Sequence, residues 1–303
     1  MANPLLLLPD FLLILLGFVI CRGTALDRAV WQAAEKLVYF LLFPVLLFNS
    51  IVKSPLQAMQ TMSLALAGVG TVAVGVVVAL AIGRWPGVDR RRHASGAQVA
   101  YRFNSYIALA LAERMQGAQG LAWVALLIAL SVPLYNVAAV WPLARHGGHS
   151  YTRELTRNPL IISTVLGLVG NVAGLQLPEA LATVLQRIGV AALPLGLMAV
   201  GAGLTVGGLK AASGLATALL GIRHALLPAV AIGLTLALHL APEQSGIVVL
   251  FAALPTASST YVLAARMGGD GGFVAGLVTV STLLGMLSVP LWLAGLSAVT
   301  NAR

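Results

Sequence analysis

The stretches QVAYRFNSY at residues 98–106 and LPTASSTY at residues 254–261 interrupt a chain that is otherwise strongly apolar. The first carries Arg102, and a charged residue inside a membrane span costs about 2.5–3.5 kcal/mol on insertion scales. In the second, Pro255 lacks a backbone N–H group and disrupts the helical turn before it. Freed backbone groups at membrane depth need protein or water around them. We therefore expect both stretches to line a polar cavity within a membrane domain.

The composition around these stretches is that of an all-α polytopic membrane protein. Of 303 residues, 59% are hydrophobic and 9% charged, whereas soluble domains carry roughly 25% charged residues. A membrane helix needs about 20 mostly apolar residues, and the chain is predicted to contain ten such spans. They cover residues 4–21, 31–52, 61–83, 96–112, 119–143, 158–176, 184–208, 214–240, 245–265 and 272–297. The connections are short, which predicts a single membrane unit over residues 1–303.

Charge and cysteine content exclude several classes of protein. The net charge of +9 comes from basic residues placed mostly in short loops, as the positive-inside rule describes, so nucleic acid is not expected as a partner. Loops 84–93 and 145–157 should face the cytoplasm, which puts both termini in the periplasm of a bacterial inner membrane, with lipid around the spans. Cys21 is the one cysteine, so a multi-cysteine metal site is excluded. We expect no metal, cofactor or catalytic residue.

The two halves of the chain resemble each other. At an offset of 150, Pro9, Gly17 and Pro44 fall on Pro159, Gly167 and Pro194; at 152, Asn104 falls on Thr256. Residues 1–151 and 152–303 each contain five predicted spans, and an odd number makes the second half enter from the opposite side. Such inverted repeats are common in secondary transporters, whose substrate sites lie near the midplane at interrupted helices.

The interruptions are predicted to bind an anion. The N-termini of half-helices present free N–H groups at the positive end of the helix dipole, and Arg102 adds a full charge. The candidate substrate-binding residues are Arg102, Asn104, Ser105, Tyr106, Pro255, Thr256, Ser258 and Ser259, with Asn49, Gln98 and Asn136 as cavity-lining candidates.

Each of these assignments has a simpler alternative. Arg102 lies about six residues into its predicted span, so its side chain could reach cytoplasmic headgroups. The hydroxyls of residues 256–260 could bond to carbonyls one turn earlier. Arg223 and His224 are expected at the inner interface. The interiors of spans 4 and 9 contain no carboxylate, and proton relays and many Na⁺ sites use one, so ion coupling has no support.

Four motifs resemble the auxin efflux carrier family, which includes bacterial malonate-type permeases and plant auxin carriers. They are YRFNSY (101–106), SVPLYN (131–136), RNPL (157–160) and LPTASS (254–259). The resemblance implies two inverted five-helix repeats with helices 4 and 9 broken and crossing at the substrate. It makes Asn104 and Pro255 the crossover asparagine and proline. It also implies a scaffold of spans 1, 2, 6 and 7, which often dimerises, and a moving domain of spans 3–5 and 8–10.

Two features depart from the family pattern. The fourth span has no proline, so its break depends on Asn104 and Ser105, and the long cytoplasmic loop of plant carriers is missing. Regulation through that loop and the substrate auxin are therefore not expected.

The sequence predicts a secondary active or potential-driven carrier that exports a small organic anion, such as a mono- or dicarboxylate, by elevator-like alternating access. An intramembrane enzyme is one alternative, but Ser258 and Ser259 have no His or Lys in their span to act as a base. A channel or a non-transporting receptor is another, although no charged pore ring is evident.

Overall fold

The computed structural model describes residues 8–53, 58–144, 159–204, 213–257 and 259–301, and every regular element in them is a helix. The first half contains α1 (Leu8–Gly23), α2 (Arg28–Leu37), the π-helix η2 (Val38–Leu42), α3 (Phe43–Val52), α4 (Ala58–Ile82), α5 (Arg90–Gly96), the 3₁₀-helix η3 (Ala97–Ala100) and α6 (Ser105–Ala144). The second half contains α8 (Pro159–Val172), α9 (Glu179–Val190), α10 (Ala192–Ala202), α11 (Ser213–Gly221), the π-helix η4 (Ile222–Leu226), α12 (Leu227–Ala237), α13 (Pro242–Ala253), α14 (Ser259–Arg266) and α15 (Gly271–Asn301).

The helices confirm an all-α polytopic membrane protein. Within the described ranges, six helical stretches are long and apolar enough to cross a membrane, and α1 and α8 contribute shorter apolar helices. Within the described residues, each predicted span overlaps a helix or a series of short helices, and residues 4–7, 158, 205–208 and 258 of these spans lie outside the described part. The ninth predicted span is not among the six membrane-crossing helical stretches, because its break divides it into α13 and α14. Each of these helices is too short to cross a membrane alone.

The predicted loop between spans 4 and 5 is a sharp turn inside α6. The backbone is non-helical at Gln116 and at Gly117, whose φ is 55°, a value that glycine adopts without steric cost. A side chain at Gly120 would collide with the carbonyl oxygen of Ala112, so the two parts of α6 lie against each other. Gly268, with φ of 72°, occupies the corresponding turn between α14 and α15.

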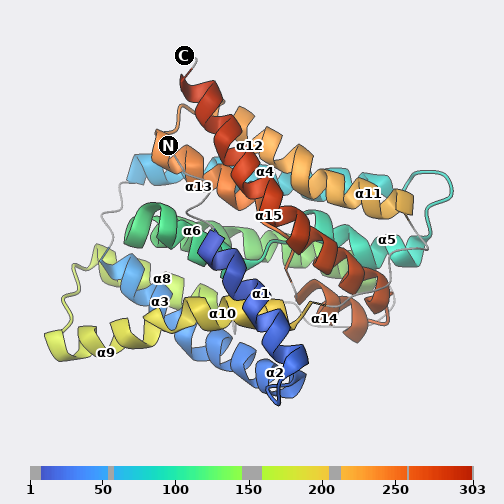
Figure 1. The fold of residues 1–303 in the computed structure, drawn as a ribbon. Coiled ribbons are helices and arrows are strands. Elements are labelled where there is room, and N and C mark those ends of the chain that lie inside the picture. Colours follow the sequence, from blue (N-terminus) through green and yellow to red (C-terminus); the bar gives the residue numbers. More distant parts are fainter. Residues whose placement is uncertain (1–7, 54–57, 145–158, 205–212, 258, 302–303) are drawn as a thin grey trace.

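The helices pack in two groups, each built from both halves of the sequence. In one group, α1 packs on α10, and α3 packs on α8 and α9. In the other, α4 packs on α6, α12 and α13, and α15 packs on α13 and α14. Figure 1 shows α2, α3, α9 and α10 in the lower half of the view and α4, α11, α12 and α13 in the upper half. The groups meet mainly where α6 contacts α3, α8 and α10.

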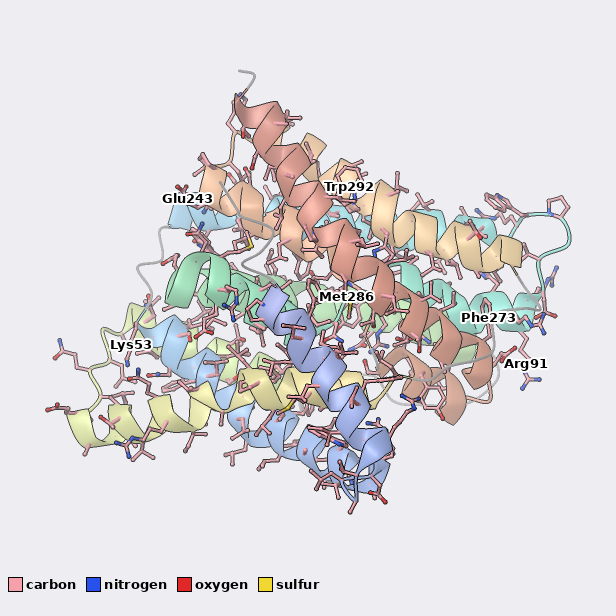
Figure 2. The ribbon with its side chains drawn as sticks, in the orientation of Figure 1. Lys53, Arg91, Glu243, Phe273, Met286 and Trp292 are labelled. Carbon is pink, nitrogen blue, oxygen red and sulfur yellow. The ribbon has the colours of Figure 1, made fainter. Side chains whose placement is uncertain are left out.

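Residues near helix ends on the two predicted sides of the membrane lie at opposite ends of the molecule (Figure 2). Figure 2 shows Lys53 and Glu243, predicted on the outer side, at the left end of the molecule. Arg91 and Phe273, predicted on the inner side, lie at the right end. Lys53 and Glu243, which come from different halves of the sequence, thus lie at the same end, as do Arg91 and Phe273.

Candidate functional site

The fourth span breaks at residues 101–104, between η3 and α6. Asn104 ends the break by capping α6: its Oδ1 accepts hydrogen bonds from the backbone N–H groups of Tyr106 at 3.0 Å and Ile107 at 3.2 Å. Asparagine is among the residues that favour this position, because its side chain satisfies N–H groups that have no partner in the first helical turn. Asn104 therefore starts α6 where a proline is missing.

The ninth span breaks where α13 ends at Ala253. Leu254 leaves the helix with φ of −55° and ψ of 147°, which is the extended conformation expected of a residue before proline. Pro255 and Thr256 continue the break, and α14 begins at Ser259. Ser258 lies outside the described residues.

The two breaks are hydrogen-bonded to each other. The backbone N–H of Asn104 donates to the carbonyl oxygen of Pro255 at 2.9 Å. Gln98 Nε2 donates to the carbonyl oxygen of Thr260 at 3.2 Å, and Arg102 Nη2 donates to Ser259 Oγ at 3.1 Å. Segments more than 150 positions apart in the chain thus form one polar crossing.

Arg102 is part of this crossing, and its side chain is buried among protein groups. It is 7% exposed, its Nη1 donates to Gln98 Oε1 at 3.2 Å, and its guanidinium lies 5.0 Å from the centre of the Tyr135 ring. The helical segment that leads to Arg102 begins at Arg90, before the predicted start of the span at residue 96. These buried contacts favour a ligand or gating role for Arg102 over snorkelling.

The crossing holds buried polar atoms without a partner. Among the described residues, the buried side-chain atoms without a hydrogen-bond partner are Asn49 Oδ1, Tyr101 Oη, Arg102 Nε, Ser131 Oγ and Thr256 Oγ1. A buried polar group without a hydrogen bond costs about 1–3 kcal/mol, so such groups need an explanation, and a ligand is one. Tyr101, Arg102 and Thr256 belong to the breaks themselves.

The predicted site residues differ in how closely they join the crossing. Gln98, Arg102, Asn104, Pro255, Thr256 and Ser259 are all within it. Ser105 and Tyr106 begin α6 and are half-buried, and the Tyr106 ring stacks on Phe43 of α3 with centroids 4.9 Å apart. Asn49 is buried and Asn136 half-buried, but no described contact joins either side chain to the breaks. Thr256 and Gln98 are 0% exposed and Asn104 is 3% exposed, whereas Ser259 is exposed, so the crossing is buried on the side of Asn104 and Thr256 and reaches solvent at Ser259.

The structure corrects the prediction for Arg223 and His224. Arg223 is 1% exposed and donates from Nε to the carbonyl oxygen of Leu254 at 2.6 Å and from Nη2 to that of Phe251 at 3.0 Å. His224 Nε2 lies 2.8 Å from Ser281 Oγ, which accepts a hydrogen bond from the N–H of Thr256 at 2.9 Å. Both residues therefore support the ninth-span break. Arg223 lies nine positions after the start of the predicted eighth span, and this depth was the signal in the sequence that both residues are buried.

The arginines at the crossing form no ion pair among the described residues. Two described ion pairs join Arg28 to Glu35 and Arg92 to Asp270. Neither pair involves Arg102 or Arg223, whose partners are carbonyl, amide and hydroxyl oxygens. A buried charge without an opposite charge nearby is costly, and an anionic ligand beside Arg102 would lower that cost.

Comparison with known proteins relates the chain to membrane transporters. The sequence pattern of the family described as "Membrane transport protein" matches residues 142–293, half of the 303-residue chain. A protein of Rhizobium meliloti (strain 1021) named "Putative malonate transporter" is 25% identical over 298 residues, covering 94% of this chain and 92% of its own. An "Uncharacterized transporter" of Methanothermobacter thermautotrophicus (strain Delta H) is 25% identical over 300 residues, covering 96% and 98%.

Proposed function

Because this chain belongs to the membrane transport protein family, we propose that it is a secondary carrier that exports a small organic anion. This family is the group of auxin efflux carriers that the motifs of the chain resemble. A mono- or dicarboxylate is the substrate class that the site favours. The name of the Rhizobium relative supports malonate as the first candidate.

The crossing of the two breaks carries this proposal. It brings Arg102, the amide of Asn104 and the hydroxyl of Thr256 into one buried region, and Arg102 Nε and Thr256 Oγ1 are left without partners. Carboxylate oxygens are the acceptors that a guanidinium binds best. Ser258, Ser259, Ser105 and Tyr106 would complete the ring of donors around the anion, and Pro255 keeps the backbone open beside it.

The two packing groups support an elevator-like mechanism. The group containing both breaks would move as one body against the group of α1–α3 and α8–α10, with α6 at the boundary. The stacked pair of Tyr106 and Phe43 joins the two groups next to the crossing, so it would separate and re-form during transport. Exposed apolar residues on α1 and α8, such as Leu16 and Val169, offer the scaffold a surface for lipid or for a second copy of the chain.

The membrane potential supplies the driving force in this proposal. The chain would lie in a bacterial inner membrane with both termini in the periplasm. An inside-negative potential favours anion exit by about 2.3 kcal/mol per charge per 100 mV, which corresponds to a gradient of about 50-fold for a monovalent anion.

Flux measurements with the purified chain in liposomes would test the proposal. Vesicles loaded with radiolabelled malonate should release it faster when a potassium gradient and valinomycin make the lumen negative, and the rate should saturate with malonate concentration. Vesicles without protein are the control. Release that does not saturate would indicate a channel, and transport of cations or neutral solutes in place of carboxylates would overturn the anion assignment.

A further inference from the structure

The C-terminal end of α13 is held by a cation that belongs to the protein. The last carbonyl groups of a helix have no donor within the helix and carry partial negative charge. Here two oxygens at this end, those of Phe251 and Leu254, accept hydrogen bonds from the guanidinium of Arg223 at 3.0 and 2.6 Å. Arg223 is among the largest fully buried side chains of the described chain, so this contact is shielded from water.

Arg223 comes from another span, at a local change in helix type. It lies in η4, a π-helical turn between α11 and α12, and such turns occur frequently at functional sites. The next residue, His224, contacts Ser281 of α15, which accepts a hydrogen bond from the N–H of Thr256. The turn therefore fixes both sides of the ninth-span break: the carbonyls before Pro255 directly, and the N–H after it through Ser281.

In ion-coupled secondary transporters, carbonyls of unwound backbone and the C-terminal ends of half-helices coordinate the driving cation. The oxygens that Arg223 contacts are of this kind. No described acidic side chain forms an ion pair with Arg223, so the carbonyls are the groups that compensate its charge. A guanidinium is a permanent cation, and in this structure it occupies these oxygens.

We propose that Arg223 takes the place of a coupling cation at the C-terminal end of α13, so that this carrier operates without Na⁺. The inference deepens the proposed function, because it concerns how the same crossing is energised. It predicts that the guanidinium of Arg223 offsets the partial negative charge of the carbonyl oxygens at the break when no ion is bound. Removing this guanidinium should leave a vacant cation site.

A thermal-stability assay tests the cation site without reference to a substrate. The wild-type protein should unfold at the same temperature in NaCl and in choline chloride at equal ionic strength. Arg223→Gln should unfold at a lower temperature in choline and regain part of the difference in Na⁺. Arg223→Lys keeps a cation and should show no response to Na⁺. Selective stabilisation of the wild type by Na⁺ would overturn the inference, whether or not the variants fold.

Flux in liposomes tests the consequence for transport. Malonate release by the wild type should be equal in Na⁺ and in choline, whereas Arg223→Gln should be slower in choline by about tenfold or more, since a hydrogen bond from a charged group contributes about 1.5–3 kcal/mol. Arg22→Gln is the matched control, because Arg22 also donates to a carbonyl near a helix end, that of Leu204 at 3.1 Å, but lies in the other packing group.

The outcomes separate the two proposals. Wild-type transport of malonate that requires Na⁺, or full activity of Arg223→Gln in choline, would defeat the role of Arg223 and leave the carrier intact. Absence of carboxylate transport, with a Na⁺-sensitive Arg223→Gln and a Na⁺-insensitive wild type in the stability assay, would defeat the anion carrier and keep the tethered cation.

Discussion

At the scale of single residues, Asn104 has a structural task as well as its proposed binding task. Its Oδ1 caps α6 through the N–H groups of Tyr106 and Ile107, so only its amide N–H group would be available to donate to a substrate. A substitution that removes both tasks cannot distinguish them. Serine, a good N-cap without an amide, separates the two.

Asn104→Ala and Asn104→Ser should both lose stabilisation by malonate, but only the alanine variant should also destabilise the unliganded protein. Loss of an N-cap costs about 1 kcal/mol, so the unfolding temperature of the alanine variant should fall while that of the serine variant stays near the wild type. Differential scanning fluorimetry with and without malonate measures both effects. Malonate binding by Asn104→Ser at wild-type affinity would show that the amide does not contact the substrate.

Arg102→Gln should raise the KM for malonate by about tenfold or more, because a hydrogen bond to a charged group contributes about 1.5–3 kcal/mol. The KM of Arg102→Lys should lie between those of the wild type and Arg102→Gln, since lysine keeps the charge but lacks the planar, two-pronged guanidinium. Initial rates in liposomes give the comparison, with Arg90→Gln, an exposed arginine at the start of α5, as the control. An unchanged KM in Arg102→Gln would reduce Arg102 to a link between Gln98 and Ser259.

At the scale of elements, the ninth-span break is shaped by the helix packed on it. A side chain on Gly285 of α15 would lie 3.0–3.2 Å from the ring atoms of Pro255, closer than a rigid ring tolerates without movement. Gly285→Ala should therefore reduce the rate of malonate transport in liposomes. Gly295→Ala in the same helix adds a methyl group with nothing within 4 Å and should transport normally. Equal rates in the two variants would show that the break tolerates displacement.

The pair of α1 and α10 depends on close approach of two backbones. A side chain on Gly17 would collide with the carbonyl of Met198, and one on Gly201 with the carbonyl of Ile14; small residues allow such contacts between membrane helices. Gly17→Ala should lower the unfolding temperature in detergent, because overpacking costs about 1–3 kcal/mol. Gly23→Ala, in the same helix but with open space, should not. Similar temperatures for both would mean that α1 packs loosely.

At the scale of the whole molecule, the separation of charged loops predicts the topology. Lys53 lies at one end of the molecule and Arg91 at the other (Figure 2). In a Cys21→Ser background, Lys53→Cys should react with a membrane-impermeant maleimide on intact spheroplasts, whereas Arg90→Cys should react only after lysis. The reverse pattern would place both termini in the cytoplasm and invert the predicted orientation.

The sequence by itself determined the all-helical membrane fold and the positions of the two breaks. Both follow from local chemistry: hydropathy over a span, the missing N–H of Pro255, and the capping ability of Asn104. The helix before the fourth-span break begins at Arg90, ahead of the predicted span, because residues 90–92 are arginines that an apolar span cannot include.

Only the tertiary structure decided which groups meet. The bond between Asn104 and Pro255, the contact of Arg102 with Ser259, and the use of Arg223 to hold the end of α13 join segments far apart in the chain. Hydropathy gives the cost of placing an arginine in a span but not the partner that offsets it. That partner depends on how helices from both halves pack, and packing is a property of the folded chain as a whole.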